Sequence, residues 1–198
     1  MRTLIAITQL SVDGVMQAPG GPEEDRSNGF THGGWAMSFG DDTLHKVINE
    51  IMAGEFDMLL GRRTYDIFSA YWPHAASGPI ANAFNKATKY VVTHRSDPLE
   101  WGPSQRVGAD AVDAIRRLKA ANGPALHIWG SSNLLQTLIA ADVVDEYRIW
   151  VAPVVLGEGK RLFENGAPAR VLSLAATQRT STGVLINTYR PASSLPSV

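Results

Sequence analysis

The amino-acid sequence predicts one α/β domain with a mainly parallel sheet, helices on both faces and an antiparallel end. Strand and helix signals alternate from the N-terminus to Asp142, as in a parallel sheet whose strands are joined through helices. After Asp142 three strand signals follow with no helix between them, which indicates antiparallel pairing. The 198 residues, 44% of them hydrophobic, are enough to bury a single core.

Apolar spacing places the helices, and short apolar runs place the strands. The clearest helix is Asp41 to Ala53, where apolar residues recur three and four positions apart and Gly54 stands as a C-terminal stop. Leu4 to Ile7 is typical of a buried strand. In chain order we expect a strand at 4–7, a helix at 41–53, a strand at 58–60, a helix at 64–71, a strand at 90–92, a helix at 110–122, a strand at 126–129, a helix around 134–139, and strands at 147–151, 171–175 and 184–189.

Composition and charge exclude several classes of function. With 18 Lys and Arg against 19 Asp and Glu, the chain lacks the concentrated positive charge that binding to nucleic acid or anionic membranes needs. The absence of cysteine excludes disulfides, thiolate nucleophiles and Cys-ligated metals. The N-terminus has no secretory pattern, and the longest uncharged run, 123–141, is too polar to span a bilayer. We therefore expect a cytoplasmic protein that binds neither nucleic acid nor membrane.

Local motifs of other chemistries are missing. There is no H-E-x-x-H and the five histidines are scattered, so we expect no metal site. Neither G-x-S-x-G nor a Walker A run occurs. The pattern G-x-G-x-x-G begins at Gly157 and fails at Leu162, so a Rossmann fingerprint is absent.

A long irregular stretch, 17–40, contains six glycines and two prolines. Structureless loops of this length in compact domains are usually lids, binding loops or disordered segments. Trp35, Met37 and Phe39 favour a ligand-covering, lid-like loop over a solvated insertion. We also expect residues 191–198 to form a disordered tail.

Three predicted strand ends carry residues suited to phosphate. These ends are Gly61, Arg62, Arg63 and Thr64; Thr93, His94, Arg95 and Ser96; and Gly130, Ser131 and Ser132. Free N–H groups at helix N-termini attract anions, and guanidinium and hydroxyl groups bind phosphomonoesters. Each end alone is also explained by helix capping or a solvated turn. Together, at one edge of a sheet, they favour a ligand with several phosphates, such as a nicotinamide dinucleotide with a 2'-phosphate.

An ordered set of motifs resembles the dihydrofolate reductase-like superfamily. Within that superfamily the chain is similar to the reductase domain of the bifunctional riboflavin-biosynthesis deaminase-reductase. The resemblance is strongest to members of this group that stand alone, without a deaminase domain. The correspondence covers nearly the whole chain. The matching segments are Ser11–Gly14, Leu60–Tyr65, Trp72–Pro73, Thr93–Arg95, Gly130–Ser132, Val144–Tyr147, Ala152–Gly159 and Leu162–Phe163.

The resemblance implies a three-layer fold with a mixed eight-stranded sheet and an NADPH-dependent reductase, which we expect to be a homodimer. By position, the first strand end would hold cofactor phosphates, the second the adenosine end with its 2'-phosphate, and the third the pyrophosphate. Backbone around Ala6 would meet the nicotinamide carboxamide. Hydride would pass to a pterin-like, ribosylaminouracil-like or other conjugated small molecule, with Asp13 or Asp42 as the candidate proton donor.

Some positions depart from the family pattern. Trp129-Gly130-Ser131 stands where the riboflavin enzymes usually carry Glu-Gly-Gly, and Ile7 stands near the place of a lysine. Two alternatives therefore stay open beside the reductase: a noncatalytic NADP-binding module and a true dihydrofolate reductase. A third is that the junctions and the loop serve packing and dimerisation only.

Overall fold

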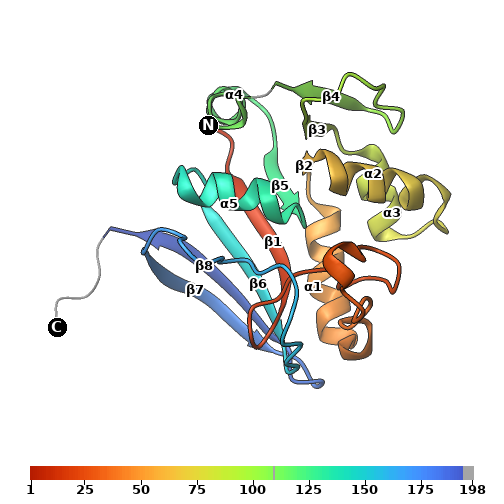
Figure 1. The fold of residues 1–198 in the computed structure, drawn as a ribbon, viewed down its shortest axis with the longest axis vertical. Coiled ribbons are helices and arrows are strands. Elements are labelled where there is room, and N and C mark those ends of the chain that lie inside the picture. The colour runs from red at the N-terminus through yellow and green to blue at the C-terminus, as the bar shows by residue number, and fades with distance from the viewer. Residues whose placement is uncertain (109, 194–198) are drawn as a thin grey trace.

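Eight strands form one sheet in the order β4-β3-β2-β5-β1-β6-β8-β7 (Figure 1). The computed structural model describes residues 1–108 and 110–193. The strands are β1 (Leu4–Ser11), β2 (Phe56–Gly61), β3 (Lys89–Val92), β4 (Ser104–Val107), β5 (Ala125–Trp129), β6 (Glu146–Ala152), β7 (Val171–Arg179) and β8 (Leu185–Ala192). The helices are α1 (Asp42–Ala53), α2 (Arg62–Tyr71), α3 (Pro79–Lys86), α4 (Ala111–Ala120) and α5 (Ser132–Ala140).

The strands from β4 to β6 pair in parallel, and β8 pairs antiparallel with both β6 and β7. The antiparallel end that the sequence predicts is therefore confirmed. Central β1 lies between β5 and β6 and is buried along nearly its whole length. Parallel strands covered on both faces are apolar throughout rather than alternating, as the run from Leu4 to Ile7 is.

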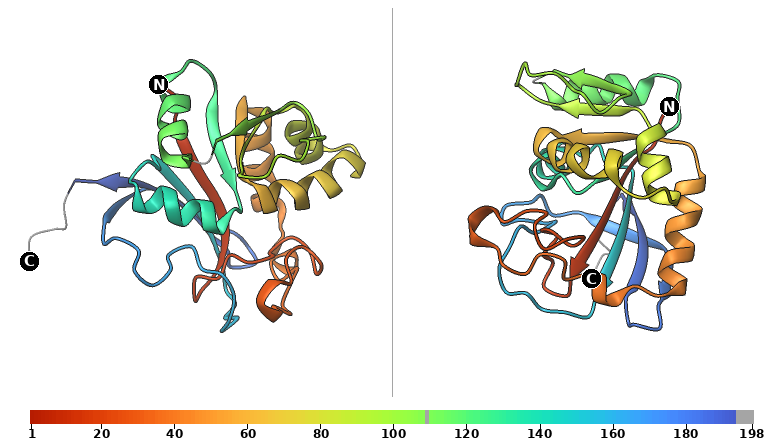
Figure 2. Two further views of the ribbon diagram at one scale, coloured as in Figure 1. Left: turned by 45° about the horizontal axis from the view of Figure 1, so that its top comes forward. Right: turned by 90° about the vertical axis from the view of Figure 1, so that its right-hand side faces the viewer.

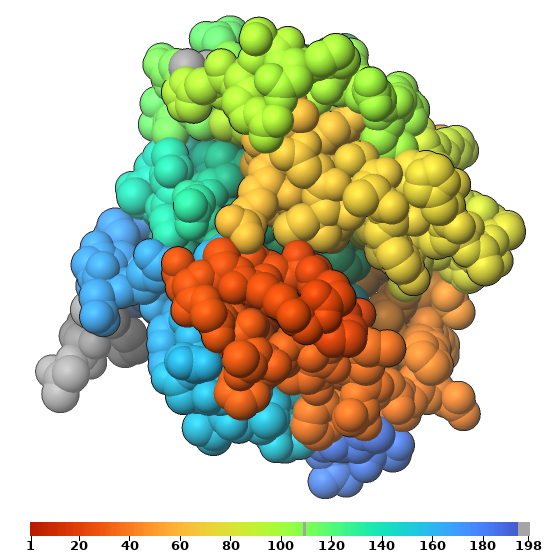
Figure 3. Space-filling model, turned by 45° about the vertical axis from the view of Figure 1, so that its right-hand side comes forward, coloured from red at the N-terminus to blue at the C-terminus, as the bar shows by residue number. Residues whose placement is uncertain are grey.

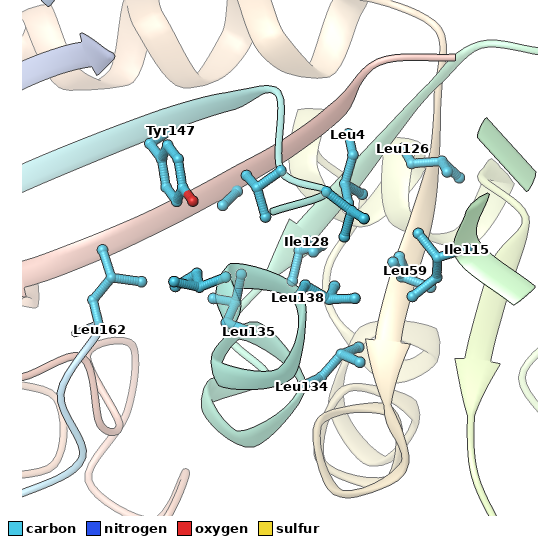
Figure 4. Packing of buried hydrophobic residues seen from close by; sticks show 14 of the residues in the cluster. Leu4, Leu59, Ile115, Leu126, Ile128, Leu134, Leu135, Leu138, Tyr147 and Leu162 are labelled. Atoms are coloured by element: carbon cyan, nitrogen blue, oxygen red, sulfur yellow. The ribbon is translucent and has the colours of Figure 1, made fainter. Parts of the chain in front are cut away.

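Helices cover both faces of the sheet (Figure 2). Leu4 and Ala6 of β1 pack with α4 and α5 in the cluster drawn in Figure 4, whereas Ile5 and Ile7 pack with α1 on the other side. Successive side chains of a strand point to opposite faces, so this alternation divides the core into two layers. The three-layer α/β fold is confirmed.

Two elements have no strong sequence signal. Strand β4 is an edge strand with exposed Gln105 and Arg106, so it lacks an apolar run. Helix α3 has only eight residues, and its sequence PIANAFNK is too short to show a repeating apolar face. The predicted tail begins later than residue 191, because Pro191 and Ala192 pair with β7. The rest of that prediction falls largely on residues 194–198, outside the described residues.

Segment 17–40 is irregular apart from two short 3-10 helices at Ser27–Gly29 and Met37–Phe39. Its aromatic residues anchor it. Trp35 Nε1 donates to the carbonyl of Gln17 at 2.8 Å, and Phe30 is buried against Val15. Trp35 and Phe39 pack against the core on the α1 side, so the loop is held in place at both ends. None of the helices in the described part of the chain is both long and apolar enough to cross a membrane.

Candidate functional site

A cavity of about 1180 Å³ opens at the carboxyl ends of β1, β2 and β5. Segment 17–40 forms one wall, and α2 and the start of α5 form the opposite one. Figure 3 shows that segment, in orange-red, bordering the gold α2. The carboxyl edge of parallel strands is where open α/β sheets bind ligands. Residues 17–25 and 37 of that segment line the cavity, and its role as a lid stays a prediction.

Two of the three predicted phosphate sites meet in this cavity and are bonded to one another. Gly61 N donates to Ser131 Oγ at 3.0 Å, and Ser131 N donates to Thr64 Oγ1 at 3.1 Å. The Ser131 hydroxyl accepts from Gly61 N, and in the described part of the chain neither N-cap residue, Gly61 for α2 or Ser131 for α5, caps its helix with a side chain. The N-termini of α2 and α5 therefore lie side by side at the cavity, and the first N–H groups of both helices are free to bind a ligand.

The turn into α5 depends on its glycine. Gly130 and Ser131 both have positive φ, 65° and 57°, which turns the chain sharply from β5 into the helix. Glycine adopts this conformation without steric cost. Thr64 lies inside the first turn of α2 and its hydroxyl accepts from Ser131 N, so it joins the two helix starts and is not the N-cap of α2.

The arginines at the start of α2 point in different directions. Arg62 Nε donates to Asp66 at 2.7 Å, whereas Arg63 Nη2 donates to Asp25 of the loop at 2.6 Å. The other oxygen of Asp25 accepts from Lys160 Nζ at 2.6 Å. Burial alone would raise the pKa of Asp25, but hydrogen bonds from Lys160 and Ser27 lower it below its usual value. The carboxylate is therefore charged and holds two cations at the cavity wall.

The third predicted site is only partly in the cavity. His94 lines the cavity, whereas Thr93, Arg95 and Ser96 lie outside its wall. Arg95 Nη1 donates to Asp66 at 3.0 Å, and its Nη2 donates to Asp97. Arg62 pairs with the same two carboxylates. This segment thus forms a charge-balanced cluster beside the cavity.

Ala6 and Asp13, from the nicotinamide-binding and proton-donor predictions, do not themselves line the cavity. Ala6 is fully buried in the core, and the following residues Ile7, Thr8 and Gln9 line the cavity instead. Asp13 accepts from the Ser11 hydroxyl and from the amides of Leu156 and Gly157; these bonds, the first above all, lower its pKa to about 2. Asp13 thus ties the chain that follows β1 to the loop that contains Leu156 and Gly157.

Asp42 is exposed in the first turn of α1 and does not line the cavity. Its neighbour Asp41 is the N-cap, accepting from Leu44 N at 2.8 Å. Neither Asp13 nor Asp42 lines the cavity, and a proton-donor role for either stays a prediction.

The cavity contains residues that sequence reasoning missed. Glu24 lines it from the loop, its Oε2 accepts from Gly20 N at 2.7 Å, and burial raises its pKa. Ile48 and Met52 line it from α1. Their spacing marks an apolar helix face, but periodicity cannot distinguish a face that packs in the core from one that faces a cavity. Among the described residues, no three His, Asp or Glu side chains are grouped to hold a metal.

Comparison with known proteins gives consistent matches. A family model described as the RibD C-terminal domain matches residues 2–186. The protein YyaP of Bacillus subtilis is 24% identical over 192 residues, which cover 95% of this chain and 94% of that protein.

Solved structures share the fold. One from Shewanella sp. PV-4, provisionally described as a riboflavin biosynthesis protein, has a TM-score of 0.68 at 18% identity and covers 96% of this chain and 99% of that chain. Dihydrofolate reductase from Enterococcus faecalis, complexed with NADP(H), has a TM-score of 0.60 at 18% identity, covering 96% of this chain and 97% of that chain. The dihydrofolate reductase-like fold expected from the motifs is confirmed.

Proposed function

Because the chain belongs to the family of RibD C-terminal domains, we propose that it is an NADPH-dependent reductase that transfers hydride to a small heterocyclic or conjugated substrate. The family supports a reductase-type function. The observation that carries the proposal is the pair of uncapped helix N-termini, α2 and α5, joined through Gly61, Ser131 and Thr64 at one edge of the sheet.

The chain offers the groups that a dinucleotide needs. Backbone N–H groups at Arg62, Arg63 and Ser132 would hold the pyrophosphate, because helix N-termini bind phosphate groups through free donors and the helix dipole. The wall also contains His94, next to the cluster around Arg95, where a 2'-phosphate would lie. When bound, the reduced nicotinamide supplies the hydride.

The remaining steps belong to the protein. Segment 17–40 lines the cavity and would cover it, excluding water from the reacting carbon. Glu24 is a cavity-lining carboxyl whose pKa burial raises above its usual value, so it is better placed than Asp13 or Asp42 to hold a proton. We therefore assign the proton-holding role to the Glu24 carboxyl.

The test is a calorimetric titration with NADPH and with NADH, in the wild type and in two variants of the first residue of α5. Ser132→Asp places a carboxylate at the helix N-terminus, where it suits the dipole and keeps the helix stable but competes with phosphate. Ser132→Asn is the uncharged control of similar size.

We expect wild type and Ser132→Asn to bind NADPH, and Ser132→Asp to bind it at least tenfold more weakly. Failure of the wild type to bind either dinucleotide would refute the proposal. Equal binding by both variants would refute the placement of the phosphates.

A further inference from the structure

We infer that the substrate is a flat, uncharged, conjugated carbonyl compound, bound at the end of the cavity formed by α1, α3 and the carboxyl ends of β5 and β6. The inference rests on the proposed function for the source of hydride. It adds the chemical class that this end of the cavity accepts, which follows from the side chains that line it.

Helix α1 turns an apolar face to the cavity. Ile48 and Met52, four residues apart on one side of the helix, line the cavity. Glu50 lies on the opposite side and lines a separate cleft with Arg148 and Arg190. The acidic residues of α1 are therefore directed away from the place where a charged substrate would need a partner.

Aromatic rings form the rest of this end. The ring centroid of Phe84 lies 5.1 Å from that of Trp72 and 5.4 Å from that of Trp129, and Trp129 lies 6.1 Å from Trp150. All four line the cavity. Phe84 and Trp150 are each 2% exposed and support Trp72 and Trp129, whose partly exposed rings offer apolar surface against which a flat molecule can pack. Such a wall favours a planar ligand over a saturated sugar.

Charged side chains of the cavity wall are found elsewhere. They lie on segment 17–40, in the first turn of α2, at the start of α4 and at Lys160. A substrate that carried a formal charge to the aromatic end would lose hydration without gaining an ion pair, which costs several kcal/mol. An uncharged substrate avoids this cost.

One polar atom at this end has no partner. The indole Nε1 of Trp129 is buried and finds no acceptor among the described residues. Buried donors are usually paired, so a ligand that supplies an acceptor would satisfy the indole N–H of Trp129. A carbonyl oxygen is such an acceptor and carries no charge.

The reaction balances with the proposed cofactor. The substrate carbon conjugated to the carbonyl gains a C–H bond as it accepts hydride, which is one hydrogen and two electrons, from a reduced nicotinamide dinucleotide. The C=C π bond breaks and its electron pair forms a new C=C bond to the carbonyl carbon, while the C=O π pair moves to the oxygen, which takes a proton from water. The substrate is reduced by two electrons and the dinucleotide is oxidised by two.

The decisive experiment compares three ligands of equal ring size without cofactor: 2-acetonaphthone, 2-naphthoate and 2-naphthylmethylammonium. Calorimetry on the wild-type protein should show the uncharged ketone binding at least tenfold more tightly than either ion. If the carboxylate or the ammonium binds as tightly as the ketone, the inference is wrong. Because no dinucleotide is present, this outcome is independent of the NADPH titration that tests the proposed function.

A pair of variants locates the ligand. Ile48→Asp places a carboxylate at the aromatic end, and Ile48→Asn is the uncharged control of the same shape; thermal melting confirms that both fold. We expect Ile48→Asp to bind the ammonium at least tenfold more tightly than Ile48→Asn does. If the two variants bind all three ligands equally, the ligands lie elsewhere and the assignment of this end is overturned.

Turnover then tests the substrate class. With NADPH as reductant, 1,4-naphthoquinone should be reduced with a kcat/KM at least tenfold above that for dihydrofolate. The reverse order would overturn the inference while leaving the reductase proposal intact.

Discussion

The guanidinium of Arg63, at the start of α2, is paired with the carboxylate of Asp25 in the covering loop, with 2.6 Å between Nη2 and Oδ1. The cation nearest to one of the proposed phosphate sites is thus already engaged by the segment that covers the cavity. A phosphate that binds at α2 would compete with Asp25 for Arg63. Cofactor binding and the position of the loop should therefore be coupled.

Replacing Asp25 should strengthen NADPH binding. In Asp25→Asn, Arg63 is free for phosphate, and because its side chain is 61% exposed the gain should be modest, about 1 kcal/mol or roughly fivefold in Kd. Calorimetry at low and high salt measures the gain, which should shrink as salt rises. Glu23→Gln, on the same loop but paired with Arg26, is the control. Weaker binding in Asp25→Asn would show that the anchored loop is itself needed for the cofactor.

Arg95 should contribute to the choice between NADPH and NADH. Its guanidinium is 57% exposed and shared with Asp66 and Asp97, so part of its charge is compensated. Arg95→Ala should weaken NADPH roughly fivefold more than NADH, because only NADPH carries the 2'-phosphate. Arg116→Ala, which removes an exposed arginine on α4, is the control. Equal losses for the two dinucleotides would contradict this placement of the 2'-phosphate.

The sequence predicted those parts of the fold that have a local signal. The junctions at Gly61 and Gly130 are visible because a tight exit from a strand requires particular residue types, and the continuous apolar run at the start of β1 follows from burial on both faces. Strand β4 was missed because its register comes from pairing with β3 rather than from apolar residues. Strand pairing is a tertiary property that no short window contains.

The site was harder to predict for the same reason. Asp13 follows a strand as a ligand-binding carboxylate would, but only the fold shows that it serves the amides of Leu156 and Gly157, distant in sequence. Glu24 has no motif, and its pKa is raised mainly by the burial that the folded loop provides, with a smaller effect of the Asp25 charge. The apolar wall at Ile48 resembles a core face in every local respect.

Acid should destabilise the protein through His127. This side chain is buried, its ring stacks on Phe56 at 4.4 Å, and Nδ1 has no partner among the described residues. Burial, with a smaller effect of Arg148, lowers its pKa from 6.5 to about 3. Between these values the unfolded chain binds the proton and the native protein does not, so the free energy of unfolding falls as pH falls through this window.

The variant His127→Phe keeps a ring on Phe56 and removes this titration. Urea unfolding near pH 7 and near pH 4 should show that the wild type loses about 1 kcal/mol per pH unit more than the variant. His45→Gln, at an exposed position on α1, should behave like the wild type. An identical pH dependence in His127→Phe and the wild type would mean that the buried ring is protonated in the native state.

Of the two glycines Gly157 and Gly159, we expect Gly159 to be the harder to replace. Comparing them separates the cost of backbone strain from the cost of a steric clash. Both Gly157 and Gly159 have positive φ, 80° and 116°, so alanine is strained at either position by about 1–2 kcal/mol. A Cβ at Gly157 meets none of the described residues within 4 Å, whereas at Gly159 it would lie 2.7 Å from Val15 and 2.9 Å from Phe30. Those buried side chains anchor the start of the covering loop, so Gly159→Ala should lower the free energy of unfolding by roughly 2 kcal/mol more than Gly157→Ala. Urea unfolding of the two variants measures the difference, and equal losses would show that the loop anchor yields to the added methyl group.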